Sequence, residues 1–205
     1  ENNTTGGYNC AFGYKALEAN TTASYNTAVG WSSLQKNTTG TGNTAFGKLT
    51  LQQNVSGINN TAVGYNALEN NTGSNNTAVG QNSLISNTSG TQNIAVGNKT
   101  LDANTTGQYN TAIGFNTLSA NISGESNTGI GKDALALTTT GNNNTAIGKD
   151  ALLSNTTGGN NIAVGHNALD ANTTADNNVA VGKDALIANT TGTQNVAIGN
   201  YALDA

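Results

Sequence analysis

The stretch Asn60-Thr61-Ala62-Val63-Gly64-Tyr65-Asn66-Ala67-Leu68 decides the fold, because variants of it recur along almost the whole chain. The first Asn of the opening pentapeptide returns at Asn9, Asn26, Asn43, Asn60, Asn76, Asn93, Asn110, Asn127, Asn144, Asn161, Asn178 and Asn195. The spacing is 17 residues at every step except the step from Asn60 to Asn76, which is 16. A strict short period is typical of solenoids, in which each unit covers the apolar face of the next.

The pentapeptide itself predicts a short β-strand. We number each unit from its first Asn as position 0. Position 1 is Thr, Ile, Val or Cys10, position 2 is Ala except for Gly129, and a Gly closes the strand at position 4. Position 3 is always large and apolar: Phe12, Val29, Phe46, Val63, Val79, Val96, Ile113, Ile130, Ile147, Val164, Val181 and Ile198. Because β-branched residues suit a pleated surface, we predict an all-β parallel β-solenoid, or β-roll, of twelve coils of about 17 residues, with residues 1–205 as one repeat domain.

The two faces of this strand differ, because neighbouring side chains in a strand point to opposite sides. The Ala face fits the narrow inside of a coil, so we expect position 3 to point outward and to form a continuous apolar stripe. Apolar stripes of that size usually mark a contact surface. We therefore expect a homotrimer, with the position-3 residues as its interface. The reverse assignment, with Val and Ile inside and Ala outside, would allow a monomer and stays open here.

The second half of each unit is equally regular. Position 8 is Leu in every unit, and we expect these residues to fill the coil interior opposite the Ala face: Leu17, Leu34, Leu51, Leu68, Leu84, Leu101, Leu118, Leu135, Leu152, Leu169, Leu186 and Leu203. The Asn-Thr-Thr-Gly segment that follows predicts a corner, because Asn and Gly tolerate positive φ. Stacked Asn side chains at position 0 would bond to one another between coils. A short helical turn across positions 5 to 10 is an alternative, as in residues 149–154.

The string Asn-Thr-Ala-Val-Gly resembles the head repeats of trimeric autotransporter adhesins. In that family a similar motif builds a left-handed parallel β-roll, and three rolls pack their Val/Ile faces together. The fuller unit in residues 60–68 is also similar to repeats of phage tail-fibre proteins. The resemblance implies a homotrimeric fibre on a bacterial cell surface or a virion tail fibre. The period here is longer than the adhesin head repeat, and the Ala-Leu pair and its Asn-Thr-Thr-Gly corner are not part of the adhesin motif.

Composition argues against several partners. The chain carries a net charge of −4 with seven scattered Lys, so no basic stripe exists to neutralise phosphates and we expect no nucleic acid partner. No apolar run approaches a membrane span, and we expect no membrane insertion by this segment. Because the chain begins near the end of one unit and stops part way through another, we expect it to be a fragment of a longer fibre.

The residue types that carry chemistry are sparse. The single Cys10 occupies a ladder position, and we interpret it as a small buried residue, with an interchain disulfide as the alternative. His166 shares the position-5 turn with Tyr14, Trp31, Lys48 and Gln81. The adjacent pairs Lys132-Asp133, Lys149-Asp150 and Lys183-Asp184 are interpreted as exposed turns whose charges stack between coils. We predict no catalytic residue, no metal site, no cofactor and no enzyme activity.

Position 5 carries the one suggestive surface pattern. Tyr14, Trp31, Tyr65 and Phe115 fall there, and they would form either a packing surface for a neighbouring chain or a platform for sugar rings. Corners such as Asn20-Thr21-Thr22 and Asn87-Thr88-Ser89 match the N-glycosylation pattern, although turn chemistry explains them fully.

From these features we expect an extracellular structural fibre or adhesin segment, a stiff trimeric rod that presents or contributes to the binding of a host-surface receptor or glycan. The alternative is a monomeric solenoid that binds glycan or ice through its Thr, Asn or aromatic ladders. An enzyme with a surface carboxylate site is a third class, which the absence of a recurring acidic pair disfavours.

Overall fold

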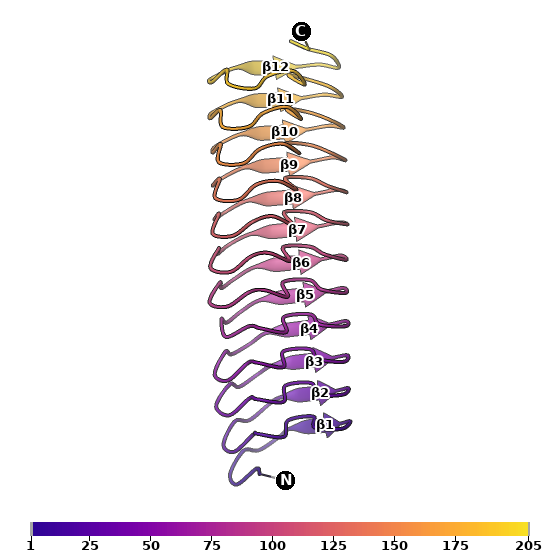
Figure 1. The fold of residues 1–205 in the computed structure, drawn as a ribbon, viewed down its shortest axis with the longest axis vertical. Coiled ribbons are helices and arrows are strands. Elements are labelled where there is room, and N and C mark those ends of the chain that lie inside the picture. Colours follow the sequence, from indigo (N-terminus) through magenta and orange to yellow (C-terminus); the bar gives the residue numbers. More distant parts are fainter. Residues whose placement is uncertain (1, 205) are drawn as a thin grey trace.

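Each pentapeptide forms a strand of three residues, from position 1 to position 3. The computed structural model describes residues 2–204, and its strands stack into a rod (Figure 1). The strands are β1 (Cys10–Phe12), β2 (Thr27–Val29), β3 (Thr44–Phe46), β4 (Thr61–Val63), β5 (Thr77–Val79), β6 (Ile94–Val96), β7 (Thr111–Ile113), β8 (Thr128–Ile130), β9 (Thr145–Ile147), β10 (Ile162–Val164), β11 (Val179–Val181) and β12 (Val196–Ile198).

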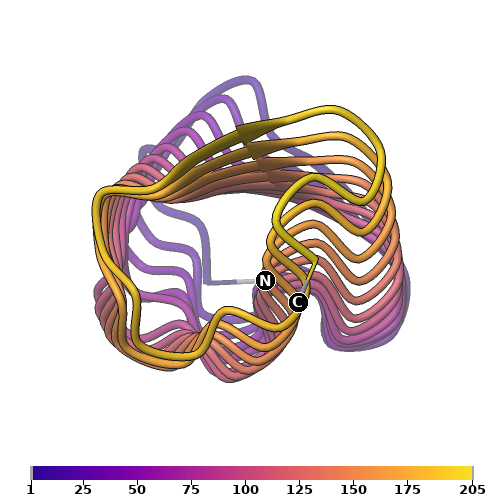
Figure 2. The ribbon, with the colours of Figure 1, turned by 90° about the horizontal axis from the view of Figure 1, so that it is seen from above.

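All twelve strands belong to one parallel sheet in chain order, β1 to β12. The register pairs like with like: Ala95 lies opposite Ala112, and Val96 opposite Ile113. Seen along the rod, the coils lie almost directly above one another and rotate gradually from the N-terminal to the C-terminal coil (Figure 2). The predicted parallel β-solenoid is thus confirmed.

The coil interior holds the Ala face and the Leu row, as expected. Ala112 and Leu118 are fully buried, and the same holds for their equivalents in the central coils. The position-3 side chains point the other way, with Ile113 39% exposed. The assignment with Ala inside is therefore confirmed, and the reverse assignment is wrong, because the narrow interior holds only Ala, or Gly129, at position 2 together with the Leu row.

Buried Asn side chains form two ladders in the interior. The position-11 ladder is interrupted at Asn71 and at Thr138, where Asn54 Oδ1 and Asn121 Oδ1 accept no hydrogen bond within residues 2–204. At position 0, the backbone N–H of Asn110 donates to Asn93 Oδ1 (3.0 Å), and Asn110 Nδ2 donates to the carbonyl of Gly124 (2.8 Å). At position 11, Asn121 Nδ2 donates to Asn104 Oδ1 (2.7 Å) and to the same Gly124 carbonyl (3.1 Å). These bonds satisfy backbone groups at both corners of the coil, which a buried corner requires.

The second half of each coil is not helical in any part of residues 2–204. Positions 6 and 8 both adopt positive φ, for example 57° at Asn116 and 52° at Leu118. A left-handed conformation costs a Leu about 1–2 kcal/mol. The cost is offset because the positive φ at positions 6 and 8 turns each Leu side chain inward and directs backbone N–H groups toward carbonyls of the neighbouring coils. Leu118 donates to the carbonyl of Ala134 (3.0 Å), and Asn116 donates to that of Asn98 in the coil before (3.1 Å).

The corner after the Leu differs from the expectation in one respect. The Asn and Gly of the Asn-Thr-Thr-Gly segment do not have positive φ; the residue just before the next position 0 does, as at Tyr109 (59°). Position 14 is usually Gly because little space is left for a side chain there. A Cβ on Gly124 would collide with Asn121 Oδ1 and with the carbonyl of Gly141 in the next coil.

The one short unit loses its residue at this corner. Asn71 Nδ2 donates to Gly73, two residues ahead (2.8 Å), where other coils reach three residues ahead. Thr61 still pairs with Thr77, so the sheet keeps its register across the deletion. The corner therefore absorbs the missing residue without moving any strand.

Candidate interaction surfaces

The first surface is the row of position-3 side chains on the outer face of the sheet, which we call the outer ladder. It consists of Phe12, Val29, Phe46, Val63, Val79, Val96, Ile113, Ile130, Ile147, Val164, Val181 and Ile198. All of these side chains are half-buried or exposed. The exposed fraction is 75% at Phe12 and 37% at Ile130. Neighbouring members lie opposite one another in the strand register, so a continuous apolar stripe follows the rod.

Position 1 lies beside the outer ladder on the same face. It is Thr in seven strands, for example Thr111 and Thr128, and these side chains are half-buried or exposed. Cys10 is exposed as well. The expectation that Cys10 is buried is therefore wrong, because position 1 faces outward and β1 pairs on one edge only.

The second surface is the position-5 column, which consists of Tyr14, Trp31, Lys48, Tyr65, Gln81, Asn98 and Phe115. Tyr14 and Trp31 stack with ring centres 6.3 Å apart. Lys48 Nζ lies 5.3 Å from the Trp31 ring centre and 5.5 Å from that of Tyr65. The structure thus brings three of the four predicted platform residues together, with Lys48 between Trp31 and Tyr65 and with Tyr14 stacked on Trp31. Phe115 lies further along, beyond Gln81 and Asn98, whose side chains hydrogen-bond to each other (3.0 Å).

In later coils, the position-5 Lys forms an ion pair with the residue that follows it. Lys132 Nζ lies 2.8 Å from Asp133 Oδ2, and Lys183 Nζ lies 3.2 Å from Asp184 Oδ2. Lys149 pairs with Asp150 in the same way. The direct ion pairs form within one coil, and the opposite charges of Lys132-Asp133 and Lys149-Asp150 also attract one another between neighbouring coils. Asn side chains add direct contacts between coils, as where Asn116 Nδ2 donates to Asp133 Oδ1.

These contacts set the pKa values of the acidic groups. Burial raises the pKa of the Asp133 carboxyl, but hydrogen bonds from Lys132 and Asn116 outweigh it and leave the pKa below its ordinary value. Burial raises the pKa of Asp170, and repulsion from Asp150 adds to the rise. Asp170 Oδ1 is buried and accepts no hydrogen bond within residues 2–204. Asp170 is thus the one carboxyl here that combines a raised pKa with an unpaired buried oxygen.

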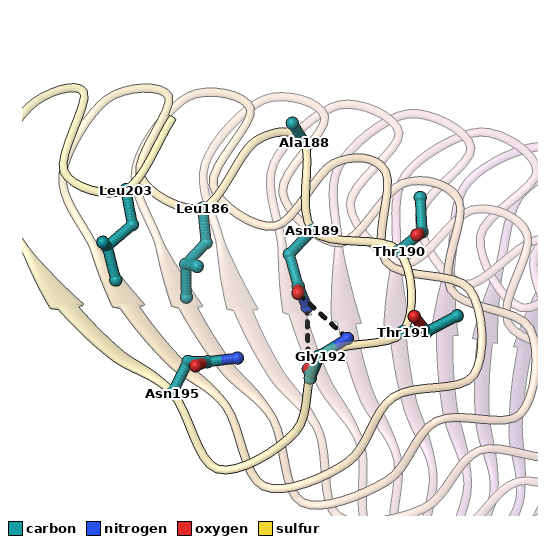
Figure 3. A pocket seen from close by; sticks show the side chains of 8 residues that line it. All are labelled: Leu186, Ala188, Asn189, Thr190, Thr191, Gly192, Asn195 and Leu203. Atoms are coloured by element: carbon teal, nitrogen blue, oxygen red, sulfur yellow. Dashed lines mark hydrogen bonds between the residues drawn. The ribbon is translucent and has the colours of Figure 1, made fainter. Parts of the chain in front are cut away.

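Two hollows, one at each end of the rod, are coil interiors seen from outside. The hollow at the C-terminal end has a volume of about 340 Å³ and is lined by Leu186, Asn189 and Leu203 among others (Figure 3). These residues occupy the positions that are fully buried in the central coils. The hollow has no convergent set of charged groups, and it offers no catalytic arrangement.

The glycosylation-type corners at Asn20 and Asn87 do not present their Asn side chains at the surface. Both Asn side chains are buried, and Asn87 Nδ2 donates to Gly90 (2.9 Å).

His166 is exposed at its position-5 turn. In residues 2–204, no three His, Cys, Asp or Glu side chains gather to hold a metal ion. The same residues contain no helix long and apolar enough to cross a membrane.

One surface feature, a stacked pair of Tyr rings, was not predicted. Tyr8 and Tyr25 stack with ring centres 5.1 Å apart at the corner before the strand. Their recurrence at a spacing of 17 residues could have revealed the pair. Position 13 forms an exposed row of hydroxyls, including Thr106 and Thr140. By contrast, Thr105 at position 12 donates to the carbonyl of Ile122 in the next coil (3.1 Å), so its row serves the solenoid itself.

In comparisons with known proteins, no family model, no curated protein and no solved structure matches this chain.

Proposed function

We propose that this chain is a segment of an extracellular structural fibre, a stiff rod that forms a homotrimer through its outer ladder. The rod presents, or contributes to, binding at a cell or host surface, as part of a bacterial surface adhesin or a virion tail fibre. The observation that carries the proposal is the outer ladder itself. Val, Ile and Phe occupy every outward position 3, although the Leu and Ala rows already fill the interior.

The energetics favour burial of this stripe. Burying apolar surface contributes about 25 cal/mol per Å², and an exposed row that continues over all twelve strands exceeds the scattered apolar groups of an ordinary surface. A parallel sheet with one bare face is also unusual, because parallel sheets are normally covered on both sides. In a trimer, the coil interior covers one face and the neighbouring chains cover the other.

The rod shape suits a spacer. Twelve strands at a spacing of about 4.8 Å give a length of about 55 Å. Backbone hydrogen bonds link neighbouring coils in the strand half and in the Leu half. A rod tied on two sides in this way resists bending and holds a binding tip at a fixed distance.

Molar mass from light scattering on a size-exclusion column tests the trimer. We expect a mass three times 20.6 kDa. The double variant Ile113→Glu/Ile147→Glu places charges in the outer ladder and should yield a folded monomer. The matched variant Thr106→Glu/Thr140→Glu, on the position-13 row, should keep the wild-type mass. A wild-type mass of 20.6 kDa would overturn the trimer.

The alternative is a monomeric solenoid that binds glycan or ice. The exposed hydroxyl row at position 13 supports ice binding, whereas the Asn ladders face inward and cannot reach a ligand. Thermal hysteresis and ice shaping at high protein concentration test it. Their absence would remove the ice-binding alternative.

A further inference from the structure

Lys48 differs from the other Lys residues of position 5. Lys132, Lys149 and Lys183 are each followed by an Asp with which they form an ion pair. Lys48 is followed by Leu49, and it forms no ion pair within residues 2–204. Its ammonium is held between two aromatic rings instead, and its charge is left without a carboxylate.

The edge of the column is a row of hydrogen-bond donors. Tyr14 and Trp31 stack with their rings at 20° to each other, and both side chains are exposed. The hydroxyls of Tyr14 and Tyr65 and the indole N–H of Trp31 lie on exposed side chains, and none hydrogen-bonds within residues 2–204. Together with Lys48, these residues occupy four successive coils, whose strands lie about 4.8 Å apart. The amides of Gln81 and Asn98 extend the row.

The charge of the rod is uneven along its length. Residues 2–81 contain three Lys and two acidic residues, a net charge of +1. Residues 82–204 contain four Lys and eight acidic residues, a net charge of −4. Three of the four aromatic residues of the column, Tyr14, Trp31 and Tyr65, therefore lie in the part of the rod that carries no net negative charge.

We propose that the position-5 column of the N-terminal coils binds an extended, carboxylate-bearing glycan, with its carboxylate at Lys48 and its hydroxyls at the Tyr, Trp and amide groups on either side. Lys15 Nζ also lies over the Tyr14 ring (5.6 Å), but it pairs with Glu18 (3.6 Å), so Lys48 is the one cation at the column without a carboxylate partner within residues 2–204. One such cation among several neutral donors fits a polymer with few charges and many hydroxyls. A nucleic acid would need a cation for almost every phosphate it contacts. Tyr14 to Phe115 spans six coil steps, about 29 Å, which is long enough for several sugar rings.

This inference goes beyond the fibre proposal and depends on it in one point only: the column must stay open beside the outer ladder when chains associate. Positions 3 and 5 are separated by a single Gly, so the column lies at the margin of the proposed trimer interface. A glycan bound there would run parallel to the rod axis.

The fluorescence of Trp31 reports binding directly, because it is the only Trp of the chain. We would titrate the protein with oligogalacturonate, a linear acidic glycan, and with a neutral glucose oligomer of equal length. Oligogalacturonate should change the Trp31 emission saturably, and the change should weaken as salt is added. Lys48→Gln should weaken binding at least about tenfold, because a hydrogen bond to a charged group is lost. Lys132→Gln, at the same position but paired with Asp133, should leave binding unchanged.

Equal binding of the neutral oligomer, equal effects of the two Lys variants, or no saturable signal would each overturn the inference. Circular dichroism of both variants shows that they are folded. Light scattering on the same samples separates this inference from the fibre proposal: a trimer that binds no acidic glycan contradicts only the inference. A monomer that binds it contradicts only the trimer.

Discussion

Replacing Asn110 with Ala breaks the position-0 ladder in the middle of the rod. The backbone N–H of Asn127 then loses Asn110 Oδ1, its acceptor at 3.0 Å, inside a buried corner. Two further bonds, from Asn110 Nδ2 to Gly124 and to Asn93 Oδ1, also disappear, although both acceptors keep another donor.

The magnitude follows from these three losses. An orphaned buried N–H costs about 1–3 kcal/mol, and each of the two other bonds contributes about 0.5–1.5 kcal/mol. The sum is centred on about 4 kcal/mol. For a chain of this size, 1 kcal/mol shifts the melting temperature by roughly 2–4 °C, so we expect a fall of roughly 8–16 °C.

Thermal and urea unfolding, followed by circular dichroism, measure the effect. The matched control is Asn142→Ala, which removes an exposed acceptor of the Glu125 N–H (2.7 Å). Water replaces that bond, so the control should change stability by less than about 1 kcal/mol. If Asn110→Ala were no more destabilising than Asn142→Ala, the buried Asn ladder would not hold the coils together and the reasoning would be refuted.

Three further predictions concern the Leu row, the left-handed turns and the unpaired carboxyl. Leu101→Ala should cost about 2–5 kcal/mol of unfolding free energy in urea, whereas Leu137→Ala on the exposed surface should cost less than about 1 kcal/mol. Lys99→Asn should raise stability by about 0.5–1 kcal/mol, because Asn tolerates its positive φ of 53° better; an unchanged urea midpoint would count against this. The pKa of the Asp170 carboxyl is raised above its ordinary value of 3.8 in the folded state, which therefore holds this proton more tightly than the unfolded state does. The folded state loses stability as the pH rises from 3.8 to the raised pKa. Asp170→Asn should therefore raise the melting temperature at pH 7, and the gain should vanish below pH 3.8. A gain that is equal at both pH values would contradict the assignment.

The period and the residue types were enough to predict the strands, their parallel register and the two faces. Ala112 and Ile113 show why: alternation puts them on opposite sides, and only a small residue fits opposite Leu118. The same reasoning applied to every coil because each coil repeats the same pattern of residues. The sequence could therefore specify the sheet without any long-range information.

The turns were harder to predict, because their conformation depends on hydrogen bonds between coils. Leu118 has positive φ, which its residue type disfavours and which only its burial and its bond to Ala134 explain. The ion pairs that each Lys forms with the Asp of its own coil were not predicted, since sequence does not show whether a side chain turns along its coil or toward the next one. The position-5 column was visible as a pattern, but the place of Lys48 between two rings required the structure.

The most direct test of the account is whether the outer ladder is covered in solution. In a Cys10→Ser background, Ile113→Cys would place a thiol on the outer ladder, and Thr106→Cys would place one on the exposed position-13 row. If the ladder is the trimer interface, a thiol reagent should modify Thr106→Cys rapidly and Ile113→Cys only as fast as the assembly opens. Equal and rapid modification of both cysteines would show an open outer ladder and contradict the trimeric rod.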